Sequence, residues 1–180
     1  MAPALDFLIV NLANTQAEFL CAAEAVAAEE WNTMPCEGRW SAAELVAHLM
    51  MVERAVIEKA TRVTQKPPKR VGLLKRIHIP MMLVEWRVIR RKSPLPLAPE
   101  LLRGREEMLA ELRKVRRRSR AFLEETRGRD LRDYCWKHPA LGTLNIYEWM
   151  RFISAHEVRH TKQMREIAAS LPNVIERLQK

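Results

Sequence analysis

The stretch HEVRH at residues 156–160 matches the pattern H-E-x-x-H, in which two histidines four residues apart hold a zinc ion from one face of a helix. In metalloproteases with this pattern the glutamate handles the proton of the attacking water, which makes Glu157 a candidate catalytic residue beside His156 and His160. Glu157 follows His156 directly and therefore points about 100° away around a helix. Two roles are open for it, an approach to a metal-bound water or an ion pair with an arginine of a neighbouring helix, and we favour the ion pair.

A protease would need a third metal ligand downstream of the second histidine. The extended protease pattern requires glycine at 163 and histidine at 166, where this chain has Gln163 and Glu166. A more distant carboxylate ligand would have to be Glu176, which follows Pro172 in what we expect to be a short tail. Because short motifs also occur by chance, we reject the protease function and keep the histidine pair as a candidate metal site.

A third histidine strengthens this interpretation. Two inward histidines alone can be core residues satisfied by hydrogen bonds. His48, however, also faces the core, since it flanks an apolar stripe formed by Leu45, Leu49 and Val52. Three neutral imidazoles from two helices, with one coordination position left open, are typical of a catalytic metal site. Zinc or nickel suits three imidazoles, whereas iron or manganese more often adds a carboxylate. Gln163 shares the ligand face and is expected to orient His160.

Amphipathic helices must position these histidines, and the spacing of apolar residues predicts them. A first helix is predicted from Leu5 to about Ala27. A second begins after Ser41, whose side chain forms a capping box with Glu44, and extends to about Val63.

Two further helices complete the prediction. The third runs from Pro99 and stops at Gly128, where a left-handed cap costs little. The fourth starts after Gly142, is capped by Asn145 and Glu148, and carries the histidine pair. No stretch alternates with period two, so we expect no strands. Four long amphipathic helices predict an all-α four-helix bundle.

The composition agrees with a helical protein and limits the number of domains and the cellular location that we expect. The chain has 180 residues, which suits a single domain over residues 1–180, and it contains only 5 glycines and 6% aromatic residues. The N-terminal sequence MAPALDFLIVNLANTQ resembles neither a signal peptide nor a membrane span. Three cysteines without C-x-x-C spacing indicate reduced thiols, so we expect a cytoplasmic protein.

Two blocks, GRWSAAELVAHLMMVE at 38–53 and HPALGTLNIYEWMRFISAHEVRHTKQM at 138–164, resemble the DinB-like (YfiT-like) superfamily of four-helix-bundle, metal-dependent enzymes. In that family W-S precedes the helix with the first histidine, and H-x-x-x-H is followed by glutamine. The resemblance implies that His48, His156 and His160 are the metal ligands. It also implies metal-dependent hydrolysis, or a thiol-dependent reaction that either transfers a low-molecular-weight bacterial thiol or isomerises maleylpyruvate. Dimers are common in the family, so a homodimer is one option.

The middle of the chain is strongly basic. Residues 66–120 contain 17 Lys and Arg against 5 Glu, whereas the remaining residues contain 14 basic against 17 acidic residues. This excess is either a solvated helix face with a long connection, or a binding surface for an anion. Nucleic acid is not expected, because no aromatic residues interleave with the charges. A long basic insert at 66–92 separates the second and third helices, and its apolar part, IHIPMMLVEWRVI, is interpreted as a lid or dimer contact in preference to a membrane-surface segment.

The remaining polar candidates have ordinary interpretations. His78 in the insert and His138 before the fourth helix are expected to be loop residues, with His138 near the entrance of the site. Cys135 is expected to be inert, and Trp40 and Trp149 to be core residues.

The sequence therefore predicts a divalent-metal-binding, DinB-like hydrolase or thiol transferase. Its substrate would be a small molecule, for which an anion is one option. The alternative is a non-enzymatic interaction or stress-response module that binds an anionic partner or a membrane surface through residues 66–120.

Overall fold

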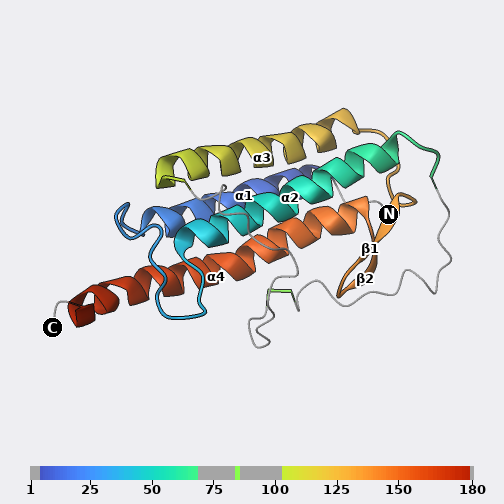
Figure 1. Ribbon diagram of the computed structural model, residues 1–180. Helices are drawn as coiled ribbons and strands as arrows, with labels where there is room; N and C mark the ends of the chain where they lie inside the picture. The colour runs from blue at the N-terminus through green and yellow to red at the C-terminus, as the bar shows by residue number, and fades with distance from the viewer. Residues whose placement is uncertain (1–4, 69–83, 86–102, 179–180) are drawn as a thin grey trace.

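The computed structural model describes residues 5–68, 84–85 and 103–178, with the backbone alone for residues 172–178. The all-α prediction of a four-helix bundle is confirmed, with the addition of a small hairpin (Figure 1). The helices are α1 (Leu5–Glu24), α2 (Ala42–Thr64), α3 (Arg105–Glu125) and α4 (Ile146–Leu178), and the strands β1 (Cys135–His138) and β2 (Gly142–Asn145) lie between α3 and α4. Within the described parts of the chain, no helix is both long and apolar enough to cross a membrane.

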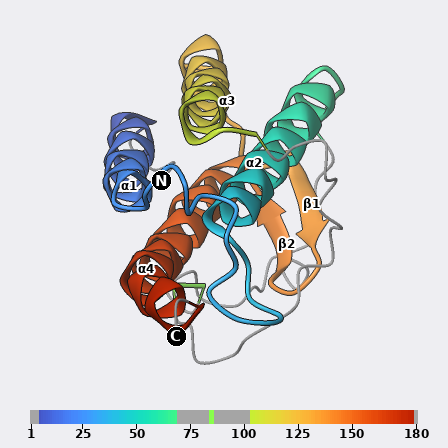
Figure 2. The ribbon, with the colours of Figure 1, turned by 60° about the vertical axis from the view of Figure 1, so that its left-hand side comes forward.

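The helices are arranged so that α2 and α3 are parallel neighbours, while α2 and α4 are antiparallel (Figures 1 and 2). Arg54 of α2 pairs with Glu111 of α3, and the carbonyl of Thr64 accepts a bond from Arg129 beyond the other end of α3. The long connection at 65–104 makes this parallel pair possible, because it returns the chain to the end where α2 began. The predicted lid or dimer contact in this connection lies largely outside the described residues, as does His78.

Capping boxes begin both helices that carry histidines. In α2 the Ser41 backbone N–H donates to Glu44 Oε2 at 2.7 Å, and Glu44 N–H donates to Ser41 Oγ at 3.2 Å. In α4 the Asn145 N–H donates to Glu148 Oε2 at 2.7 Å, and Glu148 N–H donates to Asn145 Oδ1 at 3.0 Å. Each pair satisfies backbone donors that a helix start otherwise leaves without partners, and so fixes where the helix begins.

The bounds of α1 and α3 differ from the prediction. Residues 99–102 lie outside the described parts, but Arg103 and Gly104 are not helical, so the predicted start of α3 at Pro99 is wrong. Gly104 adopts an extended N-cap conformation, and its carbonyl accepts the first helical bond, from Met108 N–H. Gly128 has a φ of +85° in the turn after α3 has ended. α1 ends before Ala27, because Val26 N–H turns back to the carbonyl of residue 23.

The hairpin contradicts the expectation that the chain contains no strands. β1 and β2 pair antiparallel, with Trp136 opposite Leu144. The ring nitrogen Nδ1 of His138 accepts the backbone N–H groups of Ala140 at 3.0 Å and Leu141 at 3.1 Å, which stabilises the turn between the strands. Strands of four residues are too short for an alternating pattern to be read from sequence.

The expected short tail after Pro172 is also wrong, because α4 continues through this proline to Leu178. A proline removes one intrahelical hydrogen bond, but the helix has already packed against the core up to the buried Leu171 and continues past it.

The apolar core consists of two clusters at opposite ends of the bundle. Each helix contributes apolar residues to both clusters, and each carries polar side chains between these two groups of apolar residues. This polar layer crosses the middle of the bundle and contains Thr15, His48, Glu53, Arg116, Ser119, His156, Glu157 and His160.

Candidate metal centre

Three histidines of the polar layer converge on one point. The Nε2 atom of His156 lies 3.3 Å from Nε2 of His48 and 3.1 Å from Nε2 of His160. One ring nitrogen from each histidine lies within 4.8 Å of the others. The antiparallel packing of α2 and α4 produces this arrangement, because it brings the second turn of α2, which carries His48, beside the middle of α4.

The donor atoms fit a divalent cation. Tetrahedral coordination with metal–nitrogen bonds of about 2.0–2.1 Å places ligand nitrogens about 3.3 Å apart, close to the two contacts of His156. An imidazole nitrogen carries either one proton or one lone pair, so Nε2 of His156 cannot form an ordinary hydrogen bond to both neighbours. A cation at the shared point would use all three lone pairs. These residues could therefore hold a metal ion.

Burial keeps the rings of His48 and His156 uncharged. His48 and His160 are each 6% exposed. Burial lowers the pKa of His48 to about 4. It also lowers the pKa of His156 well below the usual value, and the neighbouring rings of His160 and His48 lower it further. Neutral imidazoles are the form that binds a metal, so His48 and His156 are ready as ligands at neutral pH.

The side chains around the three rings fix their orientation. Gln163 Oε1 lies 3.0 Å from Nδ1 of His160. Because the amide oxygen only accepts, Nδ1 carries the proton, and the lone pair of Nε2 faces the centre. The ring of Trp40 lies 4.9 Å from that of His48, and Phe152 stacks on His156 with ring centroids 5.2 Å apart. These aromatic rings cover imidazole faces and leave the nitrogen edges toward the centre.

Glu157 forms an ion pair with an arginine of a neighbouring helix, which is the role favoured from the sequence. Glu157 is 1% exposed, and its carboxylate accepts hydrogen bonds from Arg116 Nη2 at 2.9 Å and Thr15 Oγ1 at 2.6 Å. Burial raises the pKa of Glu157 to about 6, although Arg116 opposes this shift. Glu157 is not one of the three residues grouped around the shared point.

Glu53 and Arg116, which no sequence pattern singled out, complete a buried network. Arg116 Nε and Nη2 donate to the two carboxylate oxygens of Glu53, at 2.8 and 3.0 Å, and Ser119 Oγ donates to Glu53 at 2.6 Å. Arg116 lies in the basic region 66–120, but it shares the helical phase of the buried Leu112 and is 2% exposed. That phase was the available signal, since a charged residue on an apolar face must find partners in the interior.

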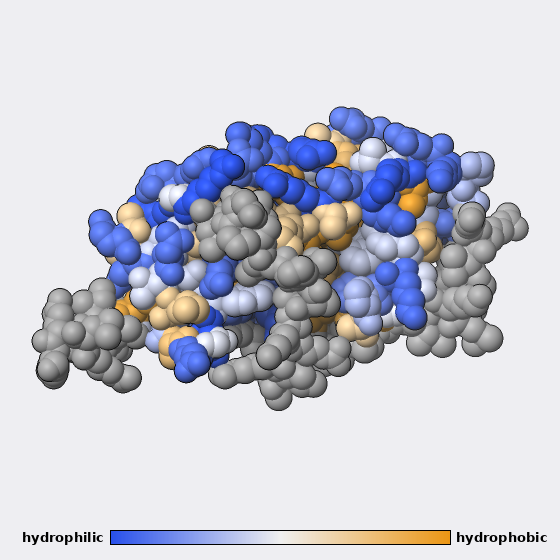
Figure 3. Space-filling view, viewed as in Figure 1, coloured by the Kyte–Doolittle hydropathy of each residue, from blue (hydrophilic) through white to orange (hydrophobic). Residues whose placement is uncertain are grey.

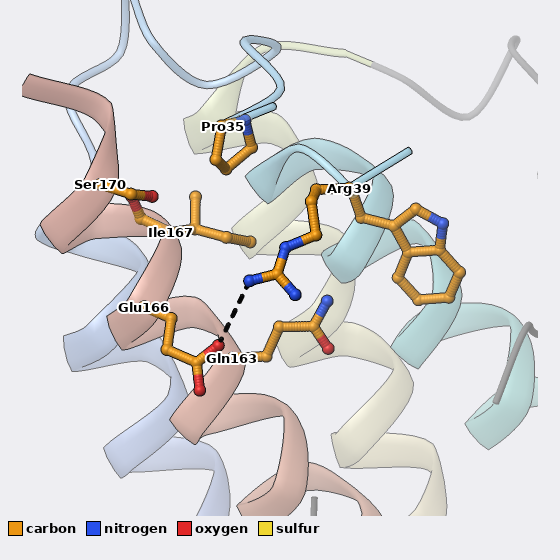
Figure 4. A pocket seen from close by; sticks show the side chains of 7 residues that line it. Pro35, Arg39, Gln163, Glu166, Ile167 and Ser170 are labelled. Atoms are coloured by element: carbon orange, nitrogen blue, oxygen red, sulfur yellow. Dashed lines mark hydrogen bonds and ion pairs between the residues drawn. The ribbon is translucent and has the colours of Figure 1, made fainter. Parts of the chain in front are cut away.

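A surface pocket lies beside the outer partners of the histidines (Figure 4). Gln163 and Trp40, which contact His160 and His48, form part of its wall. Arg39 projects into this pocket and pairs with Glu166 at 3.9 Å. The remaining lining residues are Pro35, Ile167 and Ser170.

The hairpin approaches the centre through aromatic contacts. The ring of His138 packs edge-on against Phe152 at 4.6 Å, and Phe152 stacks on His156. His138 thus lies next to the centre, while its Nδ1 accepts backbone bonds within the turn. Trp149 is a core residue as predicted, and its buried Nε1–H has no acceptor among the described residues. Cys135 donates its thiol proton to the carbonyl of Arg132 at 3.2 Å.

The described part of the basic region shows two kinds of surface. On α3, Arg117, Arg118 and Arg120 are exposed and make no ion pair with any residue that the structure describes, and this helix presents a hydrophilic outer face (Figure 3). In the connection, the carbonyls of Val84 and Glu85 lie 3.5 and 3.4 Å from side-chain nitrogens of α4, in Arg159 and Lys162. This short piece therefore lies against the helix that carries His156 and His160.

Comparisons with known proteins agree with this arrangement. A family model described as the DinB superfamily matches residues 11–164. An uncharacterized protein of Bacillus subtilis (strain 168), YuaE, is 29% identical over 142 residues, which cover 77% of this chain and 83% of the relative. No solved structure matches the chain.

Proposed function

The chain belongs to the DinB superfamily, and from this membership and the histidine geometry we propose that it is a metal-dependent enzyme acting on a small-molecule substrate. His48, His156 and His160 would hold the ion, and zinc or nickel suits three imidazoles best. The observation that carries the proposal is the convergence of three Nε2 atoms from two helices.

When bound, a divalent ion supplies Lewis-acid chemistry, because it lowers the pKa of a water or a thiol that takes its open position. The reaction is then hydrolysis of the substrate, or transfer to a low-molecular-weight thiol. The three free cysteines suit the reducing cytoplasm in which such thiols occur, and we place the protein there.

The chain's own residues prepare the site for this chemistry. Burial keeps His48 and His156 neutral, and Gln163 holds the proton of His160 on Nδ1. Trp40 and Phe152 cover ring faces and exclude water from them. The carboxylate of Glu157 accepts bonds from Arg116 and Thr15, so it acts next to the ligand His156 and is not itself a metal ligand.

Metal analysis of protein purified without a histidine tag tests the metal site. We expect about one equivalent of a divalent ion in the wild-type protein. A His48→Ala variant should lose the ion and keep its helical circular dichroism. Collapse of this variant would instead indicate a structural ion, and a metal-free wild-type protein that binds no added zinc or nickel would contradict the proposal.

An activity screen tests the reaction class. The metal-loaded protein is assayed with small thiols plus electrophiles, and in parallel with ester and amide substrates. Turnover in one panel alone, lost in the His48→Ala variant, assigns the class. Turnover that survives this substitution would show that the reaction does not depend on the histidine centre.

A second candidate function rests on the three arginines of α3 that lack ion pairs within the described parts of the chain. In this alternative the protein binds an anionic partner through α3, and the histidines only stabilise the bundle. An Arg117→Ser, Arg118→Ser, Arg120→Ser variant would then lose binding to anionic lipid vesicles while keeping its metal. Binding that is equal in the variant and the wild type would exclude this surface.

A further inference from the structure

The buried ionic network lies directly behind the metal centre. Glu53, Arg116 and Glu157 are each at most 3% exposed and belong to three different helices. Two carboxylates and one guanidinium leave this part of the interior with one excess negative charge when both acids are ionised. Buried ions of this kind carry a desolvation cost that an ion pair seldom repays in stability alone. Glu157 directly follows His156 in α4, which suggests a role for this network in the centre.

A small cavity connects the network with the centre. Its lining includes His156 of the centre and Glu53, Arg116 and Glu157 of the network, and apolar side chains complete its wall. The space open to the centre of a water molecule is about 10 Å³, about the minimum that one water needs. Such a water also requires at least two polar partners.

Two polar atoms of the lining residues have no hydrogen bond from any residue that the structure describes. Both bonds to the Glu157 carboxylate end at Oε2, which leaves Oε1 available as an acceptor. His156 contacts the other histidines through Nε2, and its Nδ1 makes no bond of its own. When Nε2 of a histidine faces a metal, Nδ1 carries the proton and needs an acceptor. Two residues that line the cavity thus offer one donor and one acceptor, the number of partners that a single water needs.

We propose that one buried water in this cavity accepts a hydrogen bond from Nδ1 of His156 and donates one to Oε1 of Glu157. This inference rests on the proposed metal function. It makes Glu157 a positioning residue, which sets the tautomer of His156 and increases the basicity of Nε2 through the water. Arg116 and Thr15 hold the carboxylate at the cavity by binding its other oxygen. The excess negative charge also offsets the charge of a divalent cation in the same interior.

Glu53 provides a matched control. Both of its oxygens are already bonded, to Arg116 and Ser119, so it has no oxygen left for the bridge. Glu53→Gln and Glu157→Gln each remove one negative charge from the same network with little change in shape. Only Glu157→Gln removes the charge from the end of the bridge.

The zinc affinity of the two variants and the wild type, measured by competition with a chromophoric chelator, tests the proposal. Loss of an outer partner of a ligand histidine weakens metal binding by about 10–100-fold. We expect a loss in this range for Glu157→Gln and a loss below about 3-fold for Glu53→Gln. Thermal unfolding of the metal-free proteins reports separately on the fold. Equal losses of affinity in both variants, or a loss in neither, would overturn the proposal.

A crystal structure of the zinc-loaded wild-type protein tests the bridge directly and does not depend on whether a variant folds. We expect one ordered water within about 3.2 Å of both Nδ1 of His156 and Oε1 of Glu157. An empty cavity, or a direct bond between these two atoms, would overturn the inference and leave the metal site intact. A wild-type protein that binds no zinc would contradict the proposed function and, with it, this inference.

Discussion

The imidazole rings of His48 and His156 lie in an interior that disfavours a charged ring, and this burial has two consequences. It keeps lone pairs available for a cation, and it makes the metal-free fold sensitive to acid. The pKa of His48 falls from 6.5 to about 4 on folding. Between these values the unfolded chain binds a proton on His48 that the folded chain excludes, so the free energy of unfolding decreases as the pH falls.

For metal-free protein in the presence of a chelator, we predict that His48 lowers the free energy of unfolding at pH 5 by about 2 kcal/mol relative to pH 7. This magnitude follows from the difference between pH 5 and the pKa of 6.5 that His48 has in the unfolded chain. Urea unfolding of the wild type and a His48→Leu variant at both pH values measures this contribution. Glu157, whose pKa is raised to about 6, opposes the change, but it does so in both proteins and cancels in the comparison. An equal pH dependence in the two proteins would contradict the prediction.

Gln163 carries a second prediction at this scale. Its Oε1 is the acceptor for Nδ1–H of His160, so Gln163→Ala should weaken zinc binding by about 10-fold. Gln163→Glu retains an acceptor at the same place and should keep the affinity at or above the wild-type value. A chelator competition assay measures both. The idea fails if the alanine variant binds zinc as tightly as the wild type.

At the scale of the elements, helix starts decide which residues face one another across the bundle. The capping boxes at Ser41 and Asn145 set the beginnings of α2 and α4, and the histidines follow at fixed distances along each helix. The antiparallel packing of these two helices then brings His48 beside His156.

We predict that Ser41→Ala lowers the free energy of unfolding by about 1 kcal/mol, because it removes the acceptor for the Glu44 N–H. Ser170→Ala is a matched control, since its hydroxyl bonds only to a carbonyl within the same helix, and it should change stability by less than about 0.5 kcal/mol. Chemical unfolding measures both variants. Similar effects of the two substitutions would show that the cap does not fix the start of α2.

These caps also explain how much the sequence could predict. Capping residues and apolar spacing are local signals, so α2 and the start of α4 were predicted to within about one residue, and the histidines were recognised because their helical phase is apolar. The hairpin was missed because four-residue strands are held by pairing and not by a pattern. Arg116 was missed because the charged residues around it in the sequence hide its place on the apolar face of the helix. Its partners Glu53 and Glu157 come from other helices, and sequence spacing does not reveal contacts between helices.

At the scale of the whole molecule, two apolar clusters enclose a polar layer that spans all four helices. The network in this layer links α1, α2 and α4 to Arg116 of α3. Removing the single cation would leave two buried carboxylates without their partner. The bundle therefore depends on Arg116 for stability, and the site depends on it for the position of Glu157.

We predict that Arg116→Met lowers the free energy of unfolding by about 3–5 kcal/mol, as expected when one partner of a buried ion pair is removed. The comparison is Arg113→Met, which breaks the exposed pair with Glu24 and should cost less than about 1 kcal/mol. Guanidinium unfolding of both variants gives the two values. Equal costs would mean that the buried network contributes no more than a surface pair.

X-ray absorption spectroscopy at the metal edge of tag-free protein tests the central claim most directly, because it identifies both the ion and its ligands. We predict a divalent ion with three imidazole nitrogens at about 2.0–2.1 Å, and two imidazoles in the His48→Ala variant reconstituted with excess metal. A wild-type spectrum dominated by sulfur or carboxylate ligands, or one that does not change when His48 is replaced, would contradict a centre built from His48, His156 and His160.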